Sequence, residues 1–213
     1  MKPATTLRHI ALAATLLTGL AAPAFARIPI ADAATTAPGA SLYRLDTALT
    51  DGAGQRFTLG EMAGAPVLVT MFYGDCHAAC PIIIETLKRT VAALGAAGKP
   101  LRVVLISLDP QHDTPASLAM LASKHDLDAP QFRLAVAADE SRTRTVAAAL
   151  NIKYRRLDNG EINHTTRVLL LDGAGTQVAS SSRLEVTPDP VFVAQIAKLL
   201  KTEKTGSDQG IAK

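Results

Sequence analysis

The chain has 213 residues, a length typical of one domain with appended segments. Hydrophobic residues make up 48% of it, which is enough to bury a core and excludes a chain that is disordered throughout. The formal net charge is only +3, aromatic residues make up 4% and tryptophan is absent, so the chain lacks the basic surface and the stacking residues of a nucleic-acid-binding protein.

The N-terminal segment has the pattern of a cleavable secretory signal peptide. Lys2 and Arg8 precede the apolar stretch 10–22, which is too short to span a bilayer comfortably. Ala24–Ala26 spells an A-x-A cleavage signal, so we expect residues 1–26 to be removed. An uncleaved membrane anchor is the alternative interpretation.

The mature protein is expected to be soluble, without a stable membrane anchor, and exported to the periplasm of a cell with two membranes. With two of the 22 basic residues removed and 19 acidic residues kept, its net charge is near +1. We expect a flexible arm at 27–40, one domain at 41–203 and a disordered tail at 204–213. The periplasm permits disulfides, and with two cysteines an intramolecular bridge would join Cys76 to Cys80.

Beyond the arm, the first predicted element is a small hairpin, with 41–46 and 55–57 on either side of the glycine-rich turn 50–54. Thr58 and Glu61 have the spacing of a capping box, which predicts a short helical turn. Apolar runs then predict strands at 66–73, 101–108, 131–137, 167–172 and 176–182. Helical spacing and helix-start signals predict helices at 80–97, 115–126, 139–150 and 188–203.

The alternation of strands and helices indicates an α/β fold built from βαβ units, to which the last two strands and the last helix add an antiparallel part. A central mixed β-sheet flanked by helices, with an N-terminal hairpin extension and cysteines in a strand–loop–helix unit, describes a thioredoxin-like fold. Cys76 lies just past the end of a predicted buried strand, and function collects beyond such strand ends in open α/β sheets.

The two cysteines are four residues apart, so both lie on one face if they occupy a helix start. Their Cα atoms would be roughly 6 Å apart, within the range of a disulfide and close enough for two thiolates to bind one ion. The helix N-terminus favours the thiolate form of both. An inert structural bridge is the alternative, but so short a loop would contribute about 2 kcal/mol, against about 3 kcal/mol for fifteen residues.

Two thiolates select Cu(I) and call for a further ligand, and imidazole suits either copper state. His77 would point about 100° away from Cys76 on a helix, His112 lies in a charged loop and His125 ends a polar helix stretch. His164 precedes the strand 167–172 by a short step, at the expected mouth of the sheet. The residues alone favour His164 and leave an ordinary hydrogen-bonded role open for all four histidines.

Three separated segments resemble the SCO/SenC family of copper-binding assembly proteins. "CHAACP" at 76–81 is similar to its C-x-x-x-C-P motif, and "ISLDPQHDTP" at 106–115 is similar to its strand and D-P-x-x-D-T-P loop. "NHTTRVLLLDGAG" at 163–175 is similar to its loop histidine, following strand and D-x-x-G turn. A lone C-x-x-x-C is a weak signal, whereas three motifs in order over about 41–200 are specific.

The resemblance implies a thioredoxin fold that binds one copper ion, Cu(I) or Cu(II), through Cys76, Cys80 and His164. It assigns Asp109 and Asp113 to holding their loop near the site rather than to the metal. It implies a copper chaperone, not an enzyme in the strict sense. Its partner would be a cytochrome c oxidase subunit, especially the dinuclear site of subunit II, or another periplasmic copper protein. Reduction of the cysteines of that subunit before loading is a further implied role.

The chain departs from the family pattern in three ways. Asn163 stands where the family often has an aspartate, so a carboxylate that could orient the imidazole of His164 is missing, although an amide oxygen also accepts hydrogen bonds. The tryptophan and "LTG" near the third strand are replaced by "FRLAVA" at 132–137. Many members are membrane-anchored, while this chain is expected to be released. These departures bear on the partner more than on the metal.

The main alternative function is a thiol–disulfide oxidoreductase of the thioredoxin-like class. Thioredoxins usually have C-x-x-C and a cis-proline opposite, whereas this spacer is one residue longer and Thr165 and Thr166 stand where that proline would be. A peroxiredoxin-like peroxidase is disfavoured because its Thr-x-x-Cys pattern is absent before Cys76. Zinc is the main rival metal, since two cysteines, one histidine and a water would suit it, but no general base is evident.

Overall fold

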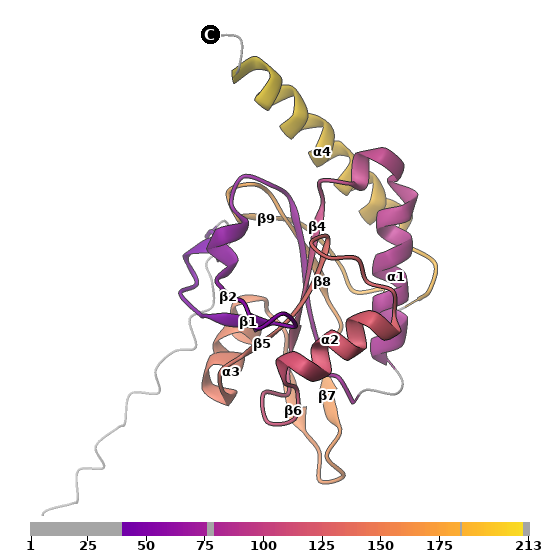
Figure 1. Ribbon diagram of the computed structural model, residues 1–213. Coiled ribbons are helices and arrows are strands. Elements are labelled where there is room, and N and C mark those ends of the chain that lie inside the picture. Colours follow the sequence, from indigo (N-terminus) through magenta and orange to yellow (C-terminus); the bar gives the residue numbers. More distant parts are fainter. Residues whose placement is uncertain (1–39, 76–78, 184, 211–213) are drawn as a thin grey trace, which may run out of the picture. The chain divides into compact units, whose positions relative to one another are not determined.

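The computed structural model (Figure 1) describes residues 40–75, 79–183 and 185–210. These residues belong to one compact unit. The expected signal peptide lies outside them, as do Cys76 and His77 of the cysteine motif. The signal peptide and the domain boundaries therefore stay predictions.

A mixed sheet of seven strands forms the centre of the described part of the chain, in the order β2-β1-β5-β4-β3-β8-β9. β3, β4 and β5 are parallel, whereas β1 and β8 run antiparallel to the strands beside them and β9 runs antiparallel to β8. The sheet confirms the predicted central mixed sheet. Its strands are β1 (Leu49–Asp51), β2 (Arg56–Phe57), β3 (Val67–Phe72), β4 (Arg102–Ser107), β5 (Phe132–Ala137), β8 (Val168–Leu171) and β9 (Gln177–Ser181).

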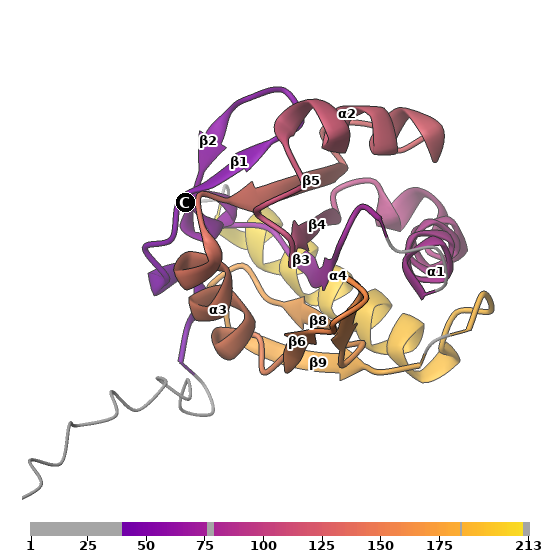
Figure 2. The same ribbon diagram turned by 90° about the horizontal axis from the view of Figure 1, so that it is seen from below.

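Helices cover both faces of this sheet, as Figure 2 shows from below. The units β3–α1–β4 and β4–α2–β5 cross in the same direction, and because such crossovers are right-handed, α1 and α2 lie on one face. α4 lies on that face beside α1, and α3, which leads back across the sheet, lies on the other. The helices are α1 (Ala79–Ala93), α2 (Pro115–Lys124), α3 (Glu140–Ala149) and α4 (Pro190–Gly210). None of the described helices is both long enough and apolar enough to cross a membrane.

β3 explains why the longest apolar run of the sequence is a strand. Its six residues are all buried, because β4 and β8 pair with its two edges and helices cover its two faces. Val69, for example, pairs with Val104 on one side and Leu169 on the other. Burial on both faces leaves no position for a polar alternation, which is the pattern of a central strand in a mixed or parallel sheet.

Local signals set the helix starts that follow the strands. Pro115 opens α2 behind Thr114, whose hydroxyl accepts a 3.2 Å hydrogen bond from the backbone N–H of Ser117. Asp139 caps α3 in the same way, accepting a 2.8 Å bond from the N–H of Arg142. The short loops from β4 to α2 and from β5 to α3 are thereby fixed at the ends of their strands.

The N-terminal hairpin is present, but its first strand lies further along the chain than predicted. β1 pairs with β2, and the carboxylate of Asp51 accepts hydrogen bonds of 3.0 and 2.8 Å from the N–H groups of Ala53 and Gln55 across the turn. Residues 41–46 do not form a strand, because the hydroxyl of Ser41 caps the 3-10 helix η1 (Leu42–Arg44). The predicted turn at Thr58 is also present, as the 3-10 helix η2 (Leu59–Met62).

Two helices end four or more residues away from their predicted ends. α1 ends at Ala93 rather than at Ala97, because Gly95 takes a left-handed φ of 55° and a 3-10 helix, η3 (Gly95–Gly98), follows. α4 continues to Gly210, past the predicted end at Glu203, and no proline stands in that stretch to stop it. The tail expected to be disordered from residue 204 therefore begins as helix.

A second, two-stranded sheet was not predicted from the sequence. It consists of β6 (Tyr154–Arg156) and β7 (Ile162–His164), paired antiparallel with Tyr154 opposite His164. Three-residue strands are too short for a periodic pattern to be recognised. The sequence "DNG", which ends at Gly160 with a φ of 87°, is a hairpin signal that would have found it.

Candidate metal centre

Cys80 lies in the first turn of α1, beyond the carboxyl end of β3. The chain leaves β3 at Phe72, passes through Tyr73, Gly74 and Asp75, and enters the helix at Ala79. The side chain of Cys80 is 3% exposed and joins the hydrophobic core. The predicted helix start is correct to one residue, so Cys80 lies in the first turn of the helix that follows β3.

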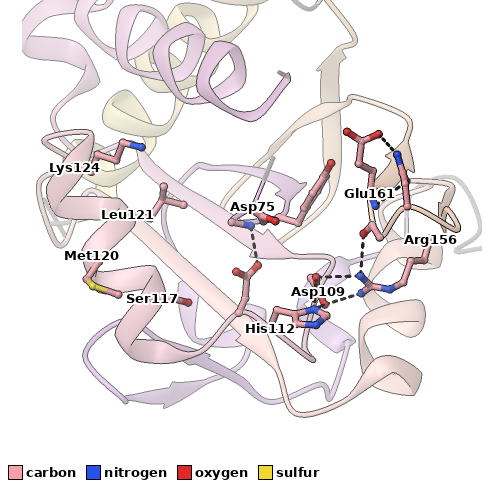
Figure 3. A pocket seen from close by; sticks show the side chains of 14 residues that line it. Asp75, Asp109, His112, Ser117, Met120, Leu121, Lys124, Arg156 and Glu161 are labelled. Atoms are coloured by element: carbon pink, nitrogen blue, oxygen red, sulfur yellow. Dashed lines mark hydrogen bonds and ion pairs between the residues drawn. The ribbon is translucent and has the colours of Figure 1, made fainter. Parts of the chain in front are cut away.

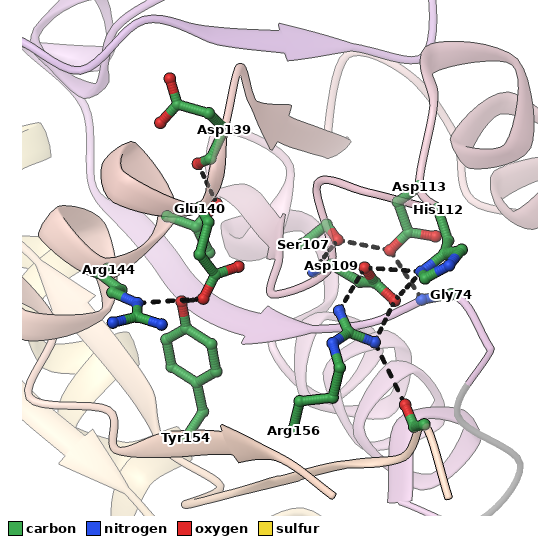
Figure 4. A network of polar contacts seen from close by, with 12 residues as sticks. Gly74, Ser107, Asp109, His112, Asp113, Asp139, Glu140, Arg144, Tyr154 and Arg156 are labelled. Carbon is green, nitrogen blue, oxygen red and sulfur yellow. Dashed lines mark hydrogen bonds and ion pairs between the residues drawn. The ribbon is translucent and has the colours of Figure 1, made fainter. Parts of the chain in front are cut away.

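The turn that leads to Cys76 is held by a buried carboxylate. Asp113 accepts a 2.9 Å hydrogen bond from the N–H of Gly74 and a 2.5 Å bond from the hydroxyl of Ser107 (Figure 4). A Cβ at position 74 would overlap the other carboxylate oxygen of Asp113, so this approach requires glycine. Burial raises the pKa of Asp113, and the bonds from Ser107 and Gly74 only partly oppose that rise.

Asp109 binds a guanidinium from the β6–β7 hairpin. Arg156 reaches it with both terminal nitrogens, Nη2 to Oδ1 at 2.6 Å and Nη1 to Oδ2 at 3.2 Å. His112 contacts the same carboxylate through Nδ1 at 2.9 Å. Burial acts to raise the pKa of Asp109, but the bonds from Arg156 and His112 outweigh burial and lower it. Asp109 is therefore negatively charged at neutral pH, and its role is to hold Arg156 and His112 in place.

His164 is the last residue of β7, so its placement on a loop is corrected to the end of a strand. Its ring packs edge-on against Tyr73, with centroids 6.1 Å apart and planes at 83°. Nδ1 lies 3.3 Å from the carbonyl oxygen of Thr165, and because a carbonyl only accepts, Nδ1 carries the proton and Nε2 keeps a lone pair. Burial lowers the pKa of His164, so the imidazole is neutral at pH 7, the form that binds a metal.

His125, read from the sequence as an ordinary residue, lies closer to the cysteine helix than expected. It caps the C-terminal end of α2 and lines a cavity of about 190 Å³ together with Cys80 and Lys124. Burial, and then the charges of Lys124 and Lys88, lower its pKa. His125 is therefore a second neutral imidazole near Cys80 and a rival ligand that experiments must separate from His164.

A larger cavity of about 670 Å³ opens beside the turn that precedes Cys76. Figure 3 shows Asp75 at its centre, α2 with Met120 on one side and Arg156 on the other. His112 also lines it, with its ring turned to Asp109. The cavity thus borders both the cysteine turn and the hairpin that carries His164.

The residues suit a soft metal ion, although the three predicted ligands are not all described. In 40–75, 79–183 and 185–210 no group of three cysteine, histidine or carboxylate side chains converges on one point. The predicted site includes Cys76, which lies outside that part of the chain. A thiol at a helix start and a neutral imidazole are donors that copper accepts. The ligand set Cys76, Cys80 and His164 stays a prediction.

Arg156 is the site residue that the sequence analysis missed. Its role depends on the β6–β7 hairpin, and without that hairpin its sequence position gives no reason to place it near Asp109. The hairpin signal around Gly160 would have brought Arg156 to the same end of the sheet as His164.

The chain matches the model of the SCO1/SenC family over residues 36–201. A search of curated proteins finds no match.

Solved structures share the fold. Arabidopsis thaliana ScoI with copper bound is 16% identical with a TM-score of 0.64, covering 73% of this chain and 96% of that one. Bradyrhizobium japonicum ScoI with copper bound is 22% identical with a TM-score of 0.62, covering 76% and 99%. BsSco, described with a disulfide switch and as a member of the Sco family of cytochrome c oxidase assembly proteins, is 16% identical with a TM-score of 0.62, covering 74% and 91%. These likenesses confirm the predicted thioredoxin-like fold.

Proposed function

Because the chain belongs to the SCO1/SenC family, we propose that it is an exported periplasmic copper chaperone for cytochrome c oxidase assembly. It binds one copper ion as cargo through Cys76, Cys80 and His164 and passes it to an oxidase subunit or another periplasmic copper protein. The two structural relatives with copper bound support the choice of metal.

The observation that carries this proposal is the contact between His164 and Tyr73. Tyr73 stands three residues before Cys76, and the two rings pack edge to face at 6.1 Å. Residues 91 positions apart in the sequence therefore meet at the carboxyl end of β3, where the helix that carries Cys80 also begins. A thiolate pair and an imidazole at one strand end make a soft, compact donor set.

The side chains prepare the site for copper before it arrives. Cys80 lies in the first turn of α1 and is 3% exposed, so its sulfur is held at the strand end and shielded from bulk water. His164 offers a neutral ring with its Nδ1 proton directed to Thr165, so the lone pair of Nε2 is free of a proton and available to a metal ion. Thiolate ligands exchange readily with those of a recipient, which suits transfer.

Copper titration of single variants tests the proposal. Wild type is expected to bind one Cu per chain with a visible thiolate-to-Cu(II) absorption band, and Cys76→Ser, Cys80→Ser and His164→Ala are expected to weaken or lose it. His125→Ala is the matched control, because it removes a second imidazole close to Cys80. If His125→Ala abolishes binding while His164→Ala keeps full affinity, the third ligand is wrongly assigned. If the wild-type protein does not bind copper, the chaperone proposal fails.

Thiol–disulfide exchange is the second candidate, favoured by the disulfide switch described for BsSco. The spacing of the cysteines permits a bridge between them, although it is one residue longer than that of thioredoxins. In this exchange, the dithiol of Cys76 and Cys80 reduces a target disulfide, and two electrons and two protons pass to the target as Cys76–Cys80 forms a bridge. Cys80 is too buried to attack first, so Cys76 would be the nucleophile. Equal reduction of a disulfide-containing target peptide by wild type and His164→Ala, without copper, would favour this function over metal delivery.

A further inference from the structure

We propose that Arg156 is a positioning residue for His164, acting through a polar network that fixes the β6–β7 hairpin to the turn before Cys76. The network runs from Arg156 to Asp109, on through Ser107 to Asp113, and ends at Gly74. The inference rests on the proposed function, in which His164 is the third copper ligand.

The hairpin depends on side chains for its position. Within the described residues, β6 and β7 form a sheet of their own that shares no ladder with the central sheet. A two-stranded hairpin is at best marginally stable alone, so its location must come from contacts with its surroundings. Tyr154 contributes one such contact, a 2.8 Å hydrogen bond to Glu140 of α3, and Arg156 contributes another.

Arg156 is placed to control where His164 lies. It sits two residues from Tyr154, which pairs directly with His164 across the hairpin. Its guanidinium holds the carboxylate of Asp109, whose side chain is 6% exposed, by two parallel bonds, and Nη1 also donates to the carbonyl oxygen of Gly160 at 3.2 Å. One side chain thus fixes both the hairpin turn and its attachment to the loop after β4 (Figure 4).

The same loop holds the cysteine side of the site. The hydroxyl of Ser107 accepts a 2.9 Å bond from the N–H of Asp109 and donates a 2.5 Å bond to Asp113, which in turn accepts from Gly74. Gly74 precedes Cys76 by two residues. The loop is therefore the common support of the two segments that supply the proposed ligands, and the ion pair of Arg156 and Asp109 is its connection to the histidine.

Arg156→Ala tests the inference, with Arg155→Ala as matched control, because Arg155 is its exposed neighbour on β6 and points to the other face. In the metal-free protein, NMR should show weaker ring-to-ring contacts between Tyr73 and His164 and faster amide exchange in β6 and β7 for Arg156→Ala alone. With Cu(II), this variant should keep the thiolate band but lose nitrogen hyperfine coupling from the imidazole, and its copper affinity should fall about 10- to 100-fold.

A double variant, Asp109→Asn with Arg156→Gln, covers the case in which Arg156→Ala does not fold. It leaves no unpaired buried charge and should reproduce the loss of the Tyr73–His164 contact. If Arg156→Ala or the folded double variant keeps the ring contact and the nitrogen coupling of wild type, the inference is overturned. Failure of the proposed function is distinguishable, because a wild type that binds no copper still gives the metal-free ring contact by which the positioning role is measured.

Discussion

Replacement of Asp113 should separate the hydrogen-bonding role of this buried carboxylate from its charge. Asp113→Ala leaves two donors without their acceptor, the N–H of Gly74 and the hydroxyl of Ser107. An unpaired buried donor costs about 1–3 kcal/mol, so the loss is about 2–6 kcal/mol. Removing a carboxylate whose burial is unfavourable offsets part of that loss. We expect the free energy of unfolding to fall by about 2–4 kcal/mol.

Asp113→Asn is the matched variant, because its amide oxygen can accept from the same two donors. It should cost about 1 kcal/mol or less at neutral pH. The raised pKa of Asp113 means that the folded protein binds more protons than the unfolded chain between the ordinary carboxyl value, about 4, and the raised value. Stability that wild type has below this window is lost as the pH rises through it, and Asp113→Asn avoids that loss.

Urea unfolding followed by circular dichroism across this pH range measures both effects. The asparagine variant should gain on wild type as the pH rises from about 4 toward neutrality, whereas the alanine variant should stay the least stable throughout. An asparagine variant as unstable as alanine would mean that the charge, not the acceptor geometry, holds the turn. A wild type and an asparagine variant that change in parallel with pH would refute the reasoning about burial.

Three further predictions concern neighbouring residues. Gly74→Ala should lower the free energy of unfolding by about 1–3 kcal/mol in urea melts, because its Cβ would overlap a buried carboxylate oxygen, and an unchanged midpoint would contradict that overlap. The pKa of Asp109 is lowered, so this carboxylate stabilises the fold at pH values above the ordinary carboxyl pKa, and that stabilisation is lost as the pH falls through the lowered pKa. Acid unfolding of Asp109→Asn should lack this pH-dependent loss of stability. Asn163→Asp should leave copper affinity within about threefold of wild type by competitive titration, because successive residues of a strand point to opposite faces and residue 163 therefore points away from His164. A tenfold gain would show that a carboxylate does orient His164.

The sequence predicts those elements whose hydrophobic pattern extends over many residues. β3 and the helix that carries Cys80 were recognised because a continuous apolar run and a helical period are both consequences of burial. The α2 start was recognised because Pro115 and its capping neighbours act locally. The first hairpin strand was displaced because a serine cap, a competing local interaction, turned Leu42–Arg44 into a 3-10 helix within the predicted strand 41–46.

The residue types of the candidate site could be predicted from the sequence, but the contacts that hold these residues in place could not. Cys80 and His164 could be proposed from spacing and from the family resemblance, but the ring contact with Tyr73 depends on a hairpin of two three-residue strands. The pairing of Arg156 with Asp109 spans 47 positions, and neither residue has a pattern that names the other. Long-range ion pairs of this kind follow from topology, so they become visible only when the strand order is known.

The replacement of the family's aspartate by Asn163 matters less for His164 than the sequence suggests, because both residues lie on β7. Successive residues of a strand point to opposite faces, so Asn163, which is exposed and pairs with Arg155, points away from His164. The carbonyl of Thr165 supplies the hydrogen-bond acceptor that the missing carboxylate was expected to supply, at 3.3 Å from Nδ1. A backbone acceptor orients a metal-binding imidazole without adding charge. The absence of the aspartate therefore changes the charge around the site. His164 still keeps a lone pair on Nε2, because the carbonyl of Thr165 accepts the Nδ1 proton.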